Sequence, residues 1–216
     1  MMESLTGVIL VAFTSFFTLI NPLGTMPVFM TMTAGLTEKE KRQTAIKAVI
    51  TAFVSLVFFA FSGQLLFNFF GISVHGFRIV GGVIFFQMGF DMLQARLSRV
   101  KVKPEDARTY VSDISITPLG IPMLCGPGSI TNIIVLMEDA QGPLQKGALL
   151  TVVAIVLFIT MLVLIGSSRI SRMIGETGNK VMMRIMGLIV MVIAVEFFVS
   201  GLRPILTQII SDAVNS

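Results

Sequence analysis

Six long apolar segments, separated by short polar ones, set the hydropathy pattern of this 216-residue chain. They lie at about residues 5–32, 48–70, 77–96, 115–137, 147–167 and 183–202. Because an α-helix of about 20 apolar residues spans the hydrocarbon core of a bilayer, each segment is long enough to cross it once. We therefore predict an all-α membrane protein with six transmembrane helices.

Two of the six segments contain a cluster of helix-breaking residues within an uncharged run. The first cluster, Asn21–Pro27, lies in the uncharged residues 4–37, and the second, Pro122–Ser129, lies in residues 114–137. Proline lacks a backbone donor and collides with the preceding helical turn, and each glycine lowers helix stability by about 1 kcal/mol. We expect helices 1 and 4 to be broken mid-membrane, where protein or a water-filled cavity must satisfy the freed backbone groups.

A new half-helix can begin at each break. Thr25 is a suitable N-cap with Pro27 in the first turn, so we expect the first helix to unwind over residues 21–24. In the same way, Ser129 can cap a helix that starts at Ile130. The start of a half-helix presents unpaired N–H groups that suit a carboxylate, and its end presents carbonyls that suit an ammonium group. Two facing breaks therefore suit a small zwitterion.

The two breaks supply the predicted substrate-binding residues. These are Asn21, Pro22, Gly24, Thr25, Gly126, Pro127, Gly128, Ser129 and Thr131, and Asn132 can add a further hydrogen bond. The alternative interpretation is that proline and glycine only kink these helices for packing. Interrupted helices in corresponding halves of one chain favour the binding site.

A polar stretch, Lys103-Pro104-Glu105-Asp106, divides the chain into two halves with three apolar segments each. We predict one transmembrane domain over residues 1–216, with repeat one at about 1–98, a linker at about 99–113 and repeat two at about 114–216. Because three spans reverse the direction of entry, the second repeat is expected to be inverted relative to the first. The third and sixth segments open with similar residues 106 positions apart, Phe77-Arg78-Ile79-Val80-Gly81-Gly82 and Met183-Arg184-Ile185-Met186-Gly187-Leu188.

Positive charge is concentrated in three of the loops, which hold 13 of the 16 Lys and Arg residues. These residues are Lys39, Lys41, Arg42, Lys47, Arg96, Arg99, Lys101, Lys103, Arg108, Arg169, Arg172, Lys180 and Arg184. By the positive-inside rule we predict a multi-pass protein of the cell (inner) membrane with both termini on the non-cytoplasmic side. The net charge of +4 follows from this asymmetry, so we expect no nucleic-acid partner.

The composition is typical of a membrane protein and gives no sign of an enzyme. Charged residues make up 13% of the chain and hydrophobic residues 54%, with a mean hydropathy of +0.89, whereas soluble domains carry about 25% charged residues. Cys125 is the one cysteine and His75 the one histidine, which excludes an internal disulfide and a His-based metal cluster. The Gly-Xaa-Ser-Xaa-Gly, His-Glu-Xaa-Xaa-His and P-loop motifs are missing, so we expect neither enzyme activity nor a cofactor.

Two carboxylates lie within apolar segments, Asp91 in the third and Glu196 in the sixth. An ionisable residue in a membrane span is a functional candidate, so each could carry a coupling H⁺ or help bind Na⁺. The alternative is that each side chain reaches the nearby membrane interface. The fifteen methionines, by contrast, are expected mainly to contact lipid or to fill the core.

Four segments of the chain resemble the MarC family of integral membrane proteins, which includes the SnatA-type small neutral amino acid transporters. They are Asn21-Pro22-Leu23-Gly24 through Pro27, Phe77-Arg78-Ile79-Val80-Gly81-Gly82, Gly126-Pro127-Gly128-Ser129-Ile130, and Thr177-Gly178 followed by Arg184-Ile185-Met186-Gly187-Leu188. The resemblance implies the inverted-repeat fold of the LysE-like superfamily, a site at the two breaks, and ion-coupled transport of glycine, alanine or similar amino acids. This chain has Ser129 where many members carry alanine, a departure that bears on substrate choice or on the helix cap.

The sequence therefore favours an ion-coupled secondary transporter of small neutral amino acids. Its expected partners are a zwitterionic small-molecule substrate and the lipid bilayer, and a homo-oligomer stays open. The alternatives are an exporter of another small metabolite or drug, a channel, or a membrane protein that transports nothing. A wide drug site is disfavoured because the breaks are compact and polar and the chain has no Trp and one Tyr.

Overall fold

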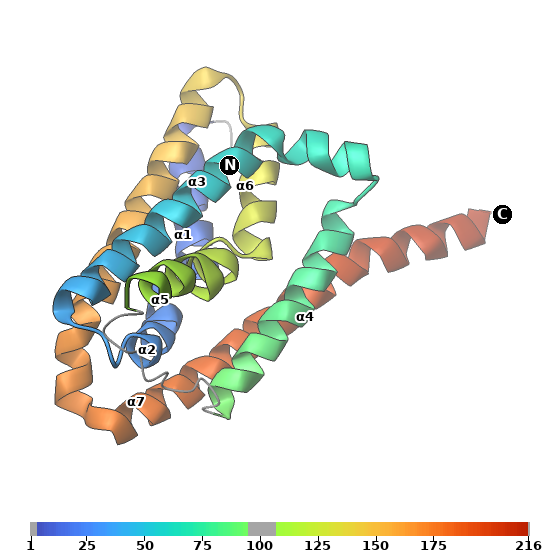
Figure 1. Cartoon of the computed structure of the whole chain (residues 1–216). Helices are drawn as coiled ribbons and strands as arrows, with labels where there is room; N and C mark the ends of the chain where they lie inside the picture. Colours follow the sequence, from blue (N-terminus) through green and yellow to red (C-terminus); the bar gives the residue numbers. More distant parts are fainter. Residues whose placement is uncertain (1–3, 95–106, 216) are drawn as a thin grey trace.

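The computed structural model describes residues 4–94 and 107–215, and all regular structure in this part of the chain is helical (Figure 1). The elements are α1 (Leu5–Ile20), α2 (Pro22–Met32), α3 (Glu38–Phe70), α4 (Val74–Leu93), α5 (Ala107–Ile114), the π-helical segment η1 (Ser115–Leu124), α6 (Pro127–Asp139) and α7 (Pro143–Asn215). About half of the predicted linker, with its basic residues Arg99, Lys101 and Lys103, lies outside the described residues, as does Arg96 at the end of repeat one. Helix α5 occupies the end of that linker.

Five stretches are long and apolar enough to cross a membrane, or six if one bent pair counts as a single span. The five are Leu5–Met32, Glu38–Phe70, Val74–Leu93, Pro143–Ser167 and Thr177–Ala213. The bent pair is Thr109–Leu124 with Pro127–Asp139, at an angle of 57°. An all-helical protein with several membrane-spanning helices is thus confirmed, and every predicted apolar segment overlaps one of these stretches.

A polar cap makes helix α3 begin ten residues before the apolar segment predicted at about 48–70. Helix α3 begins at Glu38 because Thr37 and Glu40 form a capping box. The Glu40 backbone N–H donates to Thr37 Oγ1 at 3.4 Å, and the Thr37 N–H donates to Glu40 Oε2 at 2.8 Å. At 33 residues, α3 exceeds the roughly 20 that a bilayer requires, so the polar first turns extend beyond its apolar part.

Helix α7 consists of two long arms that meet at a kink. Gly175 interrupts the helix with a φ of 65° and a ψ of −171°, a left-handed conformation that glycine adopts without steric cost. We call Pro143–Ser167 the first arm and Thr177–Ala213 the second arm. The first arm lies beside α3, and the second arm runs along α4 (Figure 1).

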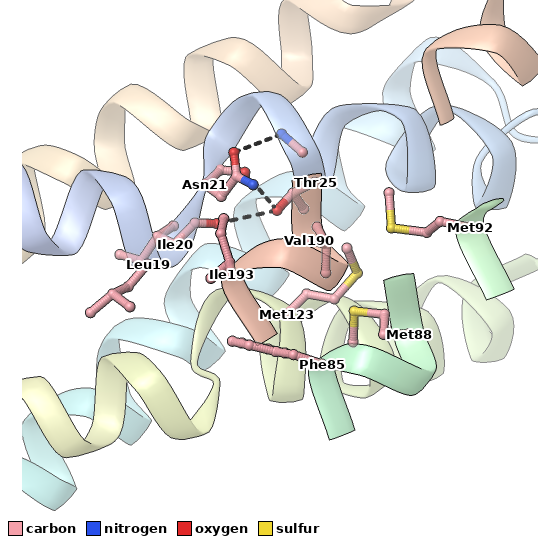
Figure 2. A pocket seen from close by; sticks show the side chains of 11 residues that line it. Leu19, Ile20, Asn21, Thr25, Phe85, Met88, Met92, Met123, Val190 and Ile193 are labelled. Carbon is pink, nitrogen blue, oxygen red and sulfur yellow. Dashed lines mark hydrogen bonds between the residues drawn. The ribbon is translucent and has the colours of Figure 1, made fainter. Parts of the chain in front are cut away.

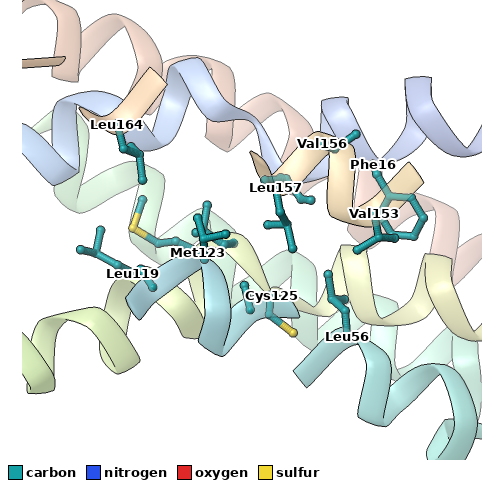
Figure 3. Close-up of a cluster of buried hydrophobic side chains, with 14 of the residues drawn as sticks. Phe16, Leu56, Leu119, Met123, Cys125, Val153, Val156, Leu157 and Leu164 are labelled. Carbon is teal, nitrogen blue, oxygen red and sulfur yellow. The ribbon is translucent and has the colours of Figure 1, made fainter. Parts of the chain in front are cut away.

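The core of the molecule lies where α1, α3, η1 and the first arm of α7 meet (Figure 3). Phe16 of α1, Leu56 of α3, Leu119 of η1 and Leu157 of the first arm are each at most 1% exposed. Lipid tails are as apolar as these side chains, so close packing and not water exclusion holds membrane helices together. The core therefore fixes α1 and η1, the two segments that lead into the breaks.

Glycines let α4 and the second arm of α7 pack closely in an antiparallel pair. A Cβ added at Gly82 would lie 2.8 Å from the Ala194 carbonyl oxygen, and one at Gly89 would lie 2.8 Å from the Gly187 carbonyl oxygen. Residue numbers rise along one helix as they fall along the other, which defines the antiparallel direction. Small residues at such crossings allow the two backbones to approach each other in a membrane.

Gly187→Ala is predicted to destabilise the protein, because the new Cβ would lie 2.7 Å from the Gly89 carbonyl oxygen and from the Leu93 nitrogen. Backbone atoms cannot move aside cheaply, so we expect a loss of about 1–3 kcal/mol in the free energy of unfolding. Thermal unfolding of the purified protein in detergent measures the effect.

Gly166→Ala is the matched control, because a Cβ at Gly166 meets nothing within 4 Å. The same substitution there should leave stability unchanged or raise it by up to about 1 kcal/mol, the difference in helix propensity. Equal losses in both variants would show that the α4–α7 crossing does not depend on the missing side chain.

Candidate functional site

Asn21 alone forms the first helix break. Its φ of 46° and ψ of 69° are left-handed, a conformation that asparagine tolerates better than other residues with a Cβ. The Asn21 N–H donates to the Phe17 carbonyl at 3.1 Å and so closes α1. Its side-chain Oδ1 accepts from the Gly24 N–H at 3.1 Å and so opens α2. With Pro22 in the first helical position, the chain breaks and restarts within one residue.

The prediction that Thr25 caps a helix after an unwound stretch is wrong. Because α2 already begins at Pro22, Thr25 lies inside the helix and its N–H donates to the Asn21 carbonyl at 3.0 Å. The Thr25 hydroxyl instead donates toward the carbonyls of Ile20, at 3.3 Å, and Asn21, at 3.2 Å. Thr25 therefore satisfies the Ile20 carbonyl, which the break has freed, whereas the Asn21 side chain satisfies the Gly24 N–H.

The second break is longer and begins earlier than the sequence predicted. Thr117 and Ile121, inside η1, have extended conformations with φ near −130° and ψ of 124°. Each precedes a proline, Pro118 or Pro122, and a residue before proline is pushed out of the helical region. The helical chain is thus irregular from Thr117, and Pro118 was the signal in the sequence that indicated it.

Helix α6 restarts the chain at Pro127, with Gly126 as its N-cap and no side-chain cap. The predicted start at Ile130 with a Ser129 cap is therefore wrong, because proline favours the first helical position and fixes the start there. The Ser129 hydroxyl instead donates toward the Leu124 carbonyl at 3.4 Å, five residues earlier. This is the same role that Thr25 has at the first break.

The two breaks lie against each other. A Cβ added at Gly128 would lie 3.1 Å from Leu19 Cδ2, just before the first break, and 2.8 Å from Phe197 Cζ. One turn further along α6, Asn132 Nδ2 donates to Ser15 Oγ of α1 at 3.0 Å. The glycine and this hydrogen bond hold the restarting helix α6 next to the end of α1.

A small cavity of about 30 Å³ lies at the first break (Figure 2). It is lined by Leu19, Ile20, Asn21, Gly24, Thr25, Phe85, Met88, Met92, Met123, Val190 and Ile193. The volume is on the order of that of one or two water molecules. No lining residue carries a charge, and the polar groups come from Asn21, Gly24 and Thr25.

The structure brings together only part of the predicted substrate-binding set. Asn21, Gly24 and Thr25 line the cavity, and Pro22 is buried next to them. The second-break residues are buried but do not line it: Gly126, Pro127, Gly128, Ser129 and Thr131. Met123, which the sequence did not single out, represents the second break in the cavity.

Two buried polar side chains, one on α6 and one in contact with the far end of α2, keep an unpaired atom. Thr131, 1% exposed, has no hydrogen-bond partner for Oγ1, although it was predicted to bind substrate. Asn179, 8% exposed, donates from Nδ2 to Thr31 Oγ1 at 3.1 Å, while its Oδ1 stays unpaired. Sequence reasoning missed Asn179 because it falls in a predicted loop, where polar residues are ordinary.

The two membrane carboxylates stand apart from the cavity. Asp91 is half-buried on α4, and Glu196 is exposed on the second arm of α7. Neither lines the cavity, although Asp91 lies between the lining residues Met88 and Met92 in the sequence. The geometry thus leaves both as candidates at a distance from the polar groups of the break.

These features define an integral membrane protein with several helical spans and two breaks that meet in its interior. Residues 6–206 match the profile of the MarC family of integral membrane proteins, and the chain belongs to this family. The UPF0056 membrane protein PH0760 of Pyrococcus horikoshii is 36% identical over 194 residues, 90% of this chain and 94% of the relative. YvbG of Bacillus subtilis, another UPF0056 membrane protein, is 36% identical over 202 residues, 91% and 96% of the two chains. No solved structure matches the chain.

Asn21 is predicted to tolerate glycine better than alanine. Asn21→Ala loses the helix cap, which costs about 1 kcal/mol, and forces a Cβ-bearing residue into the left-handed region, which costs about 1–2 kcal/mol more. Asn21→Gly keeps the conformation and should cost only a few tenths of a kcal/mol. Chemical or thermal unfolding in detergent distinguishes the two, and equal losses would show that the break does not depend on this backbone conformation.

Proposed function

We propose that the protein is a secondary transporter of small neutral amino acids such as glycine and alanine, coupled to a gradient of H⁺ or Na⁺. The observation that carries this proposal is the meeting of two broken helices in the interior, with a cavity at the first break. Discontinuous helices at mid-membrane form the substrate sites of many secondary transporters. The carboxamide of Asn21, the backbone at Gly24 and the hydroxyl of Thr25 supply polarity without a charged side chain.

An inverted repeat, proposed for the two halves, is supported by matching features of their backbones. Gly71 and Gly175, 104 positions apart, both have a positive φ at the junction of two long helices. Thr25 and Ser129, also 104 positions apart, both donate to the carbonyl five residues earlier, across a break. The antiparallel pairing of α4 with the second arm of α7 is the direction that inversion of the third and sixth spans requires.

The cavity favours a small neutral solute. A zwitterion has no net charge, which fits a lining without charged side chains. Because the cavity of about 30 Å³ has room for only one or two water molecules, binding of even glycine requires its walls to move apart, and a drug-sized molecule would require a far larger opening. The second candidate is a less polar small metabolite, which the apolar majority of the lining residues favours. Asp91 and Glu196 are the proposed coupling residues, and Asp91 is the nearer in sequence to the cavity wall.

Counterflow in liposomes tests the proposed transport. Protein reconstituted with internal unlabelled glycine or alanine should accumulate the labelled amino acid in a saturable way, and imposed H⁺ or Na⁺ gradients should identify the coupling ion. We expect Gly128→Leu to insert and to lose this exchange, because its side chain would collide with Phe197 and Leu19 beside the first break.

Gly147→Leu is the matched control, since a Cβ at Gly147 meets nothing within 4 Å; it should exchange like the unmodified protein. Normal exchange by Gly128→Leu would contradict the assignment of the site. Absence of exchange by folded, inserted, unmodified protein would contradict the amino acid substrate.

The proposed orientation in the cell (inner) membrane places both termini on the non-cytoplasmic side. Ser4 and Lys39 are exposed on opposite sides of the first span in this arrangement, and the native Cys125 is buried, with 1% exposure. We expect Ser4→Cys to react with a membrane-impermeant maleimide in right-side-out vesicles, and Lys39→Cys to react in inside-out vesicles. The reversed labelling pattern would overturn the orientation.

A further inference from the structure

The cavity has two unlike walls. Asn21, Gly24 and Thr25 place a carboxamide, a backbone segment and a hydroxyl on one side. Side chains without hydrogen-bonding groups make up the rest of the lining. Leu19 and Ile20 come from the end of α1, and the others come from α4, η1 and the second arm of α7: Phe85, Met88, Met92, Met123, Val190 and Ile193. In Figure 2 the labelled Asn21 and Thr25 lie on one side of the site, and Met88, Met123 and Phe85 lie on the other.

An amino acid can satisfy its polar groups at only one of these walls. Its ammonium and carboxylate groups must stay at the first break, because burying them against thioether and aromatic side chains without hydrogen bonds is costly. The side chain of the substrate then points toward α4 and η1. The second wall therefore meets the part of the molecule that distinguishes one neutral amino acid from another.

Met123 is the lining residue that the second broken span contributes. It lies at the end of η1 and is 7% exposed, and like its neighbours Leu124 and Cys125, at 0% and 1%, it belongs to the core cluster. The core thus fixes the backbone beside Met123, while the unbranched side chain fills the space opposite Thr25. Met88 of α4, half-buried, lies beside it in Figure 2.

Other lining residues are poorer candidates for setting the size of the site. The Phe85 ring packs against Gly126, with Cζ 2.5 Å from the position of an added Cβ, and forms an edge contact with Phe197 at 6.5 Å between centroids. Phe85 therefore supports the second break itself. Methionine, by contrast, is flexible and fills irregular gaps, so its removal enlarges the cavity with less effect on the breaks.

We propose that Met123, together with Met88, sets the upper size limit for the substrate side chain, an inference that rests on the proposed amino acid transport. When a substrate parts the walls of the cavity, the thioethers would admit a hydrogen atom or a methyl group and exclude branched side chains. A hydrophobic pocket discriminates by about 10-fold to 200-fold for each methylene group. The two breaks would then have separate tasks, one binding the amino acid backbone and the other selecting its side chain.

Truncation of Met123 tests this assignment through a gain of function. Met123→Ala removes Cγ, Sδ and Cε from the wall, so valine and leucine should compete better in the counterflow assay. We expect the ratio of valine to glycine exchange to rise by about tenfold or more over the unmodified protein. A misfolded variant loses exchange and cannot produce this gain.

Met137→Ala is the matched control, because Met137 of α6 is similarly buried, at 5% exposure, but does not line the cavity. Its profile should match that of the unmodified protein. If Met123→Ala does not fold, Met88→Ala provides the test. A raised ratio of valine to glycine exchange in this variant supports the proposed size limit, and an unchanged ratio overturns it.

The inference and the function proposed above fail in different ways. Normal glycine exchange with an unchanged valine ratio in both the Met123 and Met88 variants overturns the size limit alone. A rise in the ratio for Met137→Ala equal to that for Met123→Ala also overturns it, because the effect would then not come from the cavity. Absence of glycine and alanine exchange in the unmodified protein overturns the transport proposal itself.

Discussion

The structure depends on satisfying backbone hydrogen bonds where two helices are interrupted inside an apolar medium, which supplies no partners of its own. At the first break Asn21 closes one helix with its N–H and opens the next with its side chain, and Thr25 covers a freed carbonyl. At the second break the Cys125 N–H donates to the Gly120 carbonyl at 2.8 Å, and Ser129 reaches the Leu124 carbonyl. Short-range partners therefore make both interruptions compatible with a membrane interior.

Close packing of large side chains against glycines brings these two breaks together. Because Gly128 and Gly126 lack a side chain, Leu19 and Phe197 pack against the first and Phe85 packs against the second, and Pro127 lies directly against Gly81. Glycine in a helix lowers its intrinsic stability by about 1 kcal/mol, so a preference for local helix formation does not explain these positions. Their role is tertiary: each leaves space for a side chain from another helix.

The sequence predicted several membrane-spanning segments and the approximate position of both breaks, because hydropathy, proline and glycine act locally, although the second break begins earlier, at Thr117. It misplaced the caps at Thr25 and Ser129, since proline at the first helical position and the dual role of Asn21 moved both restarts earlier. The set of residues that line the cavity could not be predicted from local patterns. Met123 belongs to the core, as expected of the methionines, but only the folded chain shows that Met123 and Met88 also line the cavity. Asn179 was missed because the hydropathy pattern predicted a loop at this position, whereas the residue lies within helix α7.

In the proposed inverted repeat, the two halves differ at the point where their breaks meet. Both keep a hydroxyl that donates across the break, but only the first sends polar groups into the cavity, while the second sends Met123. A symmetric pair of polar breaks would surround a solute with hydrogen-bonding groups on both sides and leave no apolar surface for its side chain. In the proposed carrier, this asymmetry gives an amino acid one polar and one apolar contact, so a single small cavity both orients the substrate and limits its size.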